Sequence, residues 1–192
     1  MKGIVFTEFL EMVEDKFGYE TVDIILAKSN ESTNGKYTSI GTYKHYELVA
    51  LITSLSEETK LSIPKLLHAY GVYLFDVFLK SYPMFFEHVK SMFDFLENID
   101  SHIHKEVVKL YPDAELPKFE SNRVNDKHLI MVYYSQRKMV DFGMGLIEAS
   151  SNHFNTKIDL TKTLLGDQSG DQVQIDIKKS HLYYLKMQNS NY

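Results

Sequence analysis

Apolar residues recur every three or four positions through the first 110 residues, which is the period of amphipathic helices. The first stripe spans residues 3–17 and ends before Gly18, a residue type that commonly follows a helix. Further stripes of this period predict helices at residues 20–28, 44–58, 62–81 and 84–110. Ser62 and Pro64 favour a helix start at that point, and the polar stretch 29–35 predicts a loop.

Beyond Pro112 the pattern changes to short runs rich in β-branched, aromatic and apolar residues, which predict strands. These strands are expected at residues 118–124, 128–136, 156–162 and 172–179. A helical stripe at about 138–153 interrupts them. The chain therefore runs from a helical half into a mixed half. No linker rich in Pro or Gly separates the two, so we expect a single domain.

Composition excludes several classes of protein. The net charge of -5, with no Lys/Arg run longer than two residues, gives no footprint for nucleic acid. The amino terminus lacks the apolar core of a secretory signal, and no apolar stretch is long enough to span a membrane. We therefore expect a cytoplasmic protein. The absence of cysteine excludes disulfides, thiolate metal sites, covalently attached haem and thiol catalysis. Possible metal or haem ligands are the eight histidines at positions 45, 68, 88, 102, 104, 128, 153 and 181.

Among these histidines, His104 has the most favourable position on its predicted helix. On a helix over 89–110, at 100° per residue, His104 lies roughly 80° from the centre of the apolar stripe, and His102 about 120° away on the other side. Phe93 and Val108 flank the His104 side. An imidazole at the edge of buried space suits a ligand that reaches into an apolar pocket. Periodicity alone leaves open that both histidines are solvated.

A second group of polar residues lies in the predicted strand that follows. Side chains two apart on a strand point to the same face, so Tyr133, Ser135 and Arg137 are expected in one row. A phenol, a hydroxyl and a guanidinium together make a donor set suited to carboxylates, such as the propionates of a haem. The alternative is that this row is the exposed polar face of an edge strand.

Taken together and in chain order, several short motifs resemble the haem nitric oxide/oxygen-binding (H-NOX) family, which is related to the haem domain of soluble guanylate cyclase. The matching residues are Met1-Lys2-Gly3, His104, Tyr111-Pro112, Leu116-Pro117, Tyr133-x-Ser135-x-Arg137, Arg137-Lys138-Met139 and Gly145-Leu146-Ile147-Glu148. The resemblance implies an α+β fold in which a helical N-terminal part and a C-terminal antiparallel sheet with helices bury a haem between them. It divides the single domain 1–192 into a helical distal subdomain, about 1–60, and a haem-anchoring α/β part, about 61–185.

The resemblance also implies roles for individual residues. His104 matches the proximal ligand of a non-covalently bound haem b, whose opposite face is then free for a gas. Tyr133, Ser135 and Arg137 match the residues that hold the haem propionates. Pro117 matches a proline that presses on the porphyrin and keeps it non-planar; without the resemblance it is an ordinary turn residue.

The opposite, distal side of the haem determines which gas is bound. Relatives that bind oxygen stably carry a tyrosine where this chain has Phe142, so the donor that would stabilise bound oxygen is absent. The other positions implied for the distal pocket are also apolar: Val5, Phe9, Leu74, Phe78 and Leu146. Tyr73 and Tyr134 are nearby in sequence, but the phases of their predicted helix and strand do not aim them at the iron. An apolar pocket favours nitric oxide and carbon monoxide over oxygen, although such side chains also serve as ordinary core.

These features predict a haem-based nitric oxide sensor that is not an enzyme. Nitric oxide weakens the bond trans to it, so release of His104 and relaxation of the haem would be the signal. Relatives of this kind regulate a separate histidine kinase or diguanylate cyclase. The alternatives are an oxygen-binding haem sensor and a haem-free interaction module of the same fold. A haem enzyme is disfavoured because the distal wall offers no histidine or arginine for proton transfer.

Overall fold

The computed structural model describes residues 1–29, 35–87 and 89–180. Most of the predicted loop 29–35, together with His88 and His181, lies outside these residues. The first four helices agree with the predicted ones to within one residue or two at each end. They are α1 (Ile4–Phe17), α2 (Tyr19–Ser29), α3 (His45–Thr59) and α4 (Ile63–Ser81). Within the described part of the chain, no helix is long and apolar enough to cross a membrane.

The long helix predicted over 84–110 is wrong, because the structure divides this segment into four short elements. They are η1 (Pro83–Phe85), α5 (Met92–Glu97), the π-helical turn η2 (Ile99–Ile103) and α6 (His104–Leu110). The Ser91 hydroxyl accepts the Asp94 amide and starts α5 anew. Farther along, the amides of His102 and Ile103 both donate to the Asn98 carbonyl, which widens the helix just before α6.

The C-terminal half forms one antiparallel sheet with strand order β1-β2-β4-β3. The strands are β1 (Lys118–Asn125), β2 (His128–Tyr134), β3 (Ile158–Leu164) and β4 (Gln172–Lys179), and α7 (Val140–His153) joins β2 to β3. Alternate residues of the two central strands are buried on one face, among them Leu129, Met131, Ile175 and Ile177. The prediction of an α+β fold with a C-terminal antiparallel sheet is confirmed.

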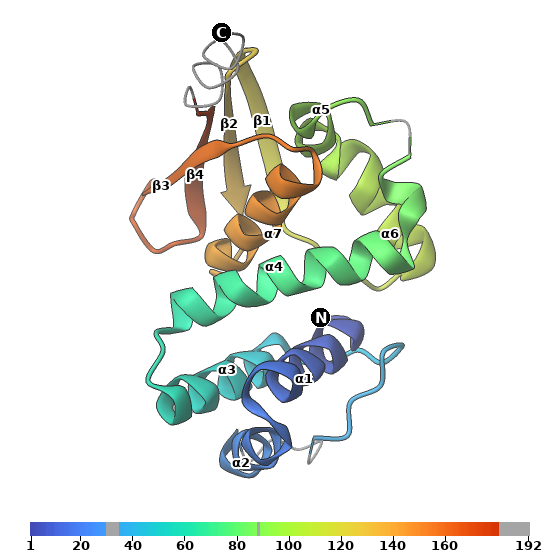
Figure 1. The fold of residues 1–192 in the computed structure, drawn as a ribbon, viewed down its shortest axis with the longest axis vertical. Helices are drawn as coiled ribbons and strands as arrows, with labels where there is room; N and C mark the ends of the chain where they lie inside the picture. Colours follow the sequence, from blue (N-terminus) through green and yellow to red (C-terminus); the bar gives the residue numbers. More distant parts are fainter. Residues whose placement is uncertain (30–34, 88, 181–192) are drawn as a thin grey trace, which may run out of the picture.

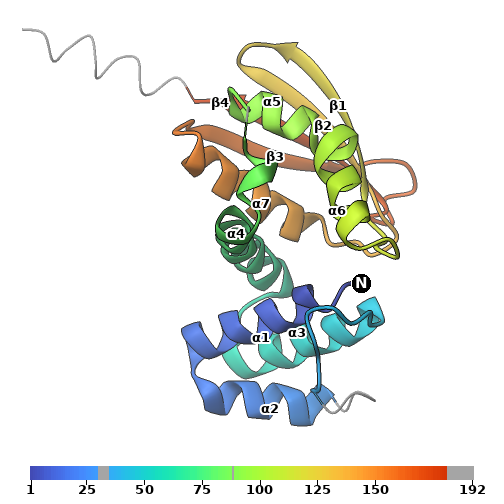
Figure 2. The same ribbon diagram turned by 90° about the vertical axis from the view of Figure 1, so that its right-hand side faces the viewer.

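Helix α4 runs between the two halves of the molecule (Figure 1). Helices α1, α2 and α3 pack on one side of it, and α7 and the sheet lie on the other side (Figure 2). Leu74 belongs to the hydrophobic core of the N-terminal helices, whereas its neighbour Phe75 belongs to the core under the sheet. Consecutive residues of one helix thus contribute to two cores, and α4 joins them.

The two helices α4 and α7 cross with their backbones in contact. A Cβ built on Gly71 would lie 2.1 Å from the Phe142 carbonyl oxygen, and one built on Gly145 would lie 2.1 Å from the His68 carbonyl oxygen. Only glycine fits at these two positions without separating the helices. Beside the crossing, Nε2 of His68 lies 3.1 Å from the carboxylate of Glu148. This contact fixes where α7 sits relative to α4.

Candidate functional site

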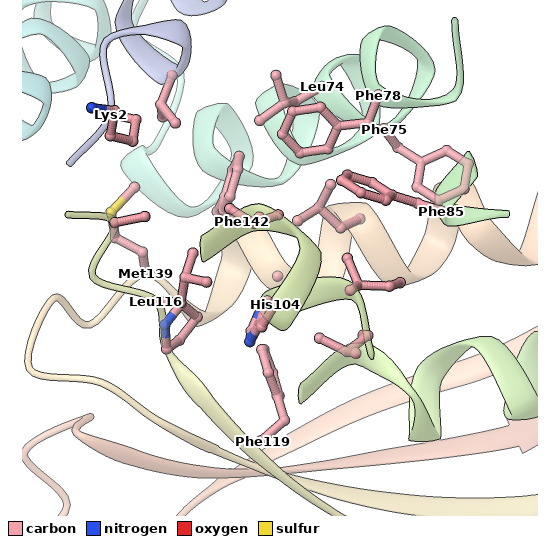
Figure 3. A pocket seen from close by; sticks show the side chains of 18 of the residues that line it. Lys2, Leu74, Phe75, Phe78, Phe85, His104, Leu116, Phe119, Met139 and Phe142 are labelled. Atoms are coloured by element: carbon pink, nitrogen blue, oxygen red, sulfur yellow. The ribbon is translucent and has the colours of Figure 1, made fainter. Parts of the chain in front are cut away.

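A cavity of about 260 Å³ lies where α1, α4, α6 and α7 meet the inner face of the sheet. Figure 3 shows the His104 ring beside Phe119 and across the pocket from Leu74 and Phe78. The lining of the cavity is largely apolar, and its few polar side chains come from the amino terminus, the C-terminal ends of α4 and β2, α6 with the residue after it, and the segments that precede β1 and follow β2.

The wall opposite His104 is made by α1, α4 and α7. The side chains that these helices place on the cavity are Ile4, Val5, Leu74, Phe75, Phe78, Phe142, Leu146 and Ile147, with Gly143 between them. None of these side chains has a hydrogen-bond donor. Tyr73 and Tyr134 do not line the cavity, as their phase predicted; the Tyr134 hydroxyl donates to Glu120 instead.

His104 is the first residue of α6 and reaches the cavity directly after the π-helical turn. Its side chain is 19% exposed, and burial lowers the pKa of the imidazole, an effect partly opposed by the nearby carboxylate of Asp100. The ring is therefore neutral near pH 7, the form in which imidazole binds a metal. His102 is exposed and does not line the cavity.

The side chains of Tyr133, Ser135 and Arg137 all line the cavity, but not as a row on one strand. Strand β2 ends at Tyr134. The Ser135 hydroxyl accepts the Arg137 amide, and Lys138 then adopts a positive φ of 55°, so the chain turns. The predicted strand was too long, and a turn rather than strand alternation brings the three side chains to the same cavity.

The guanidinium of Arg137 already binds a carboxylate. It donates to the Glu115 carboxylate at 2.8 Å and to the Glu115 carbonyl at 2.7 Å. The Glu115 side chain is 83% exposed, so this partner is held loosely in water while Arg137 is 16% exposed. The Tyr133 hydroxyl accepts the Met139 amide, which leaves its own hydrogen to donate. This end of the site can bind an anionic group.

The predicted site residues come together with one exception. The cavity is lined by Val5, Leu74, Phe78, His104, Pro117, Tyr133, Ser135, Arg137, Phe142 and Leu146. Phe9 is fully buried in the N-terminal core, where its ring lies 5.3 Å from that of Tyr70, and it does not line the cavity. Its helical phase alone could not distinguish the cavity side of α1 from the core side.

No role at the site was predicted for several residues that line or border the cavity. The hydroxyls of Tyr82 and Tyr111 bind each other at 2.9 Å at the edge of the cavity, and burial together with this bond raises the pKa of Tyr82 to about 12. Lys2 binds the carboxylate of Asp113 at 3.0 Å. Asp100, four residues before His104, was detectable in principle, because residues i and i+4 share a helix face.

The cavity has the features that a haem requires. It combines one neutral imidazole, an apolar opposite wall and a guanidinium with hydroxyls for carboxylates. Gly143 has no side chain that fills the cavity. A Cβ built on it would lie 4.0 Å from its nearest neighbouring atom, which belongs to the Phe119 ring. Within the described residues, no cluster of three or more His, Cys, Asp or Glu side chains forms a separate metal site. The residues present fit the cofactor.

Comparison with known proteins points the same way. The family model described as Haem-NO-binding matches residues 2–162. The structure is similar to that of the unliganded Fe(II) H-NOX protein from K. algicida, at 42% identity and a TM-score of 0.90, with 94% of this chain and 97% of that chain covered. It is also similar to the Fe(II)CO form of the H-NOX protein from Shewanella woodyi, at 37% identity and a TM-score of 0.80, with 94% of this chain and 95% of that chain covered.

The fold extends to more distant relatives. The Fe(II)NO form of an H-NOX protein from S. oneidensis is 23% identical and has a TM-score of 0.86, with 94% of this chain and 100% of that chain covered. Comparison with curated proteins gave no match. The family match covers most of the sequence, and the structural matches cover nearly all of it. The chain belongs to the haem-NO-binding, or H-NOX, family of haem gas-sensor domains.

Proposed function

We propose that this chain is a ferrous-haem sensor of nitric oxide that signals to a separate protein. One observation carries the choice of gas: the cavity wall opposite His104 has no hydrogen-bond donor among the side chains of α1, α4 and α7. Oxygen bound to ferrous iron carries partial negative charge and needs such a donor, whereas nitric oxide binds strongly without one. Carbon monoxide would bind for the same reason.

Several residues that line the cavity would hold a haem b. His104 would bind the iron through the ring nitrogen that remains after Nδ1 has been turned toward Asp100. Arg137, with the hydroxyls of Tyr133 and Ser135, would hold the propionates in place of the Glu115 carboxylate. Pro117 lines the cavity on the segment that leads into β1 and would contact the porphyrin. When bound, the haem supplies an iron whose bond to His104 weakens on binding nitric oxide.

The protein would convert release of His104 into a movement of α6. This helix is only seven residues long, and it follows a π-helical turn, so few backbone bonds hold it in position. Its C-terminal end contacts the rest of the molecule through the Tyr82–Tyr111 hydroxyl pair. Just beyond, Asp113 binds Lys2 and the Thr42 hydroxyl of the N-terminal part. Movement of α6 therefore changes how the N-terminal helices sit.

The signal would pass to a separate partner protein, as the family resemblance implies. A histidine kinase or a diguanylate cyclase in the cytoplasm is the partner type that the family resemblance implies. In this proposal the distal part of the chain, about 1–60, moves relative to the haem-anchoring part, about 61–185, and presents a changed surface to that partner.

The decisive test is the absorption spectrum of the purified, dithionite-reduced protein without oxygen, then with nitric oxide, and separately in air. We expect a high-spin five-coordinate ferrous band that shifts with nitric oxide and forms no stable complex in air. His104→Ala should lose the histidine-ligated band, whereas His102→Ala, an exposed neighbour on the same segment, should keep it. An intact band in His104→Ala would contradict the ligand assignment. A stable oxygen complex would contradict the choice of gas.

A further inference from the structure

Asp100 joins the proposed iron ligand to the first strand of the sheet. We propose that Asp100 is a positioning residue that orients His104, strengthens its bond to the iron and thereby determines how readily nitric oxide displaces it. This inference rests on the proposed function, since it concerns the same histidine. Asp100 is neither an iron ligand nor one of the propionate-binding or distal side chains.

The two carboxylate oxygens of Asp100 have different neighbours. Oδ2 accepts the backbone amide of Phe119 at 2.9 Å, which ties the π-helical turn to β1. Oδ1 is buried and lies 2.7 Å from Nδ1 of His104, but out of line with a ring N–H, so it lacks a regular hydrogen bond. A buried carboxylate oxygen without an aligned donor is unfavourable. The nearest group that can satisfy it is the ring of His104.

The backbone explains why the two side chains meet. Asp100 and His104 are separated by one turn, and that turn is π-helical rather than α-helical. The Phe119 ring lies 6.1 Å from the His104 ring, on the same strand residue whose amide holds Asp100. The carboxylate is therefore anchored from the sheet, and it reaches His104 from a fixed point. A ring rotation in His104 is resisted by a group that does not belong to α6.

The chemistry of this contact favours one ring form. A carboxylate at Nδ1 keeps the proton on that nitrogen, so Nε2 is left as the metal donor. The negative charge also makes the imidazole a stronger donor to the iron. Ligand orientation and ligand strength thus depend on one side chain. Removing its charge should weaken the iron–histidine bond and speed its breakage when nitric oxide binds.

Asp100→Asn separates the two roles of this residue, because the amide oxygen of Asn can still accept from the Phe119 amide. Resonance Raman spectra of the ferrous protein should show a lower iron–histidine stretching frequency in Asp100→Asn than in the wild type. Conversion from the six- to the five-coordinate spectrum after addition of nitric oxide should be about tenfold faster. Asp94→Asn is the matched control: it removes the same charge from α5, where Asp94 binds Arg123 and does not line the cavity.

Unchanged stretching frequency and conversion rate in Asp100→Asn would overturn the inference and leave the proposed function intact. If the wild type itself gives no histidine-ligated ferrous band, the proposed function fails and this inference fails with it. If Asp100→Asn does not retain haem, a second variant tests the role of Asp100. His104→Gly is supplied either with free imidazole or with N-methylimidazole, and the iron–nitrogen stretching frequencies of the two complexes are compared. Imidazole, which can donate to Asp100, should give the higher iron–nitrogen frequency; equal frequencies would refute the role of Asp100.

Discussion

Replacing Gly71 by Ala should destabilise the protein, while the same substitution at Gly143 should stabilise the haem-free form. Both glycines lie within helices that border the cavity. The Cβ of an alanine at 71 would lie 2.1 Å from the Phe142 carbonyl oxygen, although ordinary contact begins at about 3.4 Å. The Cβ at 143 would find its nearest neighbour only at 4.0 Å.

The magnitudes follow from two opposing effects. Alanine gains about 1 kcal/mol over glycine in a helix interior at either position. At position 71, forcing α4 and α7 apart costs roughly 1–3 kcal/mol, and the upper end applies because the obstructing atom belongs to the backbone. We therefore expect a net loss of about 2 kcal/mol for Gly71→Ala, or about 4–8 °C in Tm. Gly143→Ala should gain about 1 kcal/mol, or about 2–4 °C.

Urea and thermal unfolding of the two haem-free variants, followed by circular dichroism, provide the assay. Binding of haem adds a second comparison, because the methyl group at 143 stands at the cavity wall near Phe119 and should reduce the gain in stability on haem binding. If both substitutions change the unfolding free energy in the same direction, the close contact between α4 and α7 does not determine the stability of this fold.

Three further predictions concern the cavity and its edges. An unfilled apolar cavity of about 260 Å³ lowers the stability of the fold by about 6 kcal/mol, so haem removal should lower Tm by about 12–24 °C in scanning calorimetry. Equal Tm values with and without haem would contradict binding of haem in this cavity. Phe142→Tyr adds a donor worth about 1.5–3 kcal/mol to bound oxygen and should slow oxygen release about 10- to 150-fold in stopped-flow measurements, whereas no change would mean that residue 142 faces away from the gas. Hydrogen bonds from Thr42 and Lys2 lower the pKa of Asp113 to about 2, below its ordinary 3.8. The contribution of ionised Asp113 to the free energy of unfolding should thus be present above pH 4 and disappear toward pH 2. The difference in unfolding free energy between wild type and Asp113→Asn should therefore become smaller over that range in urea titrations.

The helices and strands were largely predictable because their apolar periods are regular. The exception is the segment that carries His104. There the apolar residues continue at helical spacing from Val89 to Leu110, yet the structure divides the segment into α5, the π-helical turn η2 and α6. Local hydrogen bonds that the Ser91 hydroxyl and the Asn98 carbonyl accept from backbone amides override the period, and the distant Phe119 amide donates to Asp100. The spacing of apolar residues along the chain does not reveal such hydrogen bonds.

The polar residues of the site were easier to predict than its walls. Few residue types can bind a haem iron or a propionate, and His104 and Arg137 occur in motifs whose order along the chain resembles the family's. An apolar residue of the cavity wall, in contrast, looks like any core residue in the sequence. Phe9 and Phe142 illustrate the limit: Phe9 is buried and Phe142 is half-buried, both rings contact Tyr70, and only Phe142 lines the cavity. Which side of a helix faces a cavity depends on how two cores meet, and that is a property of the whole fold.

Two contacts determine how α4, with the N-terminal helices packed on it, sits relative to the part of the chain that carries His104, and they differ in how they respond to movement. At the crossing of α4 and α7, Gly71 and Gly145 allow backbone to touch backbone, and neither glycine has a side chain that could change rotamer. Beyond α6, Lys2 reaches Asp113 through a flexible, partly exposed ion pair. When α6 moves, the Lys2–Asp113 contact can shift while the backbone contact between α4 and α7 stays intact. We therefore expect the N-terminal helices to turn about the crossing rather than to separate from it.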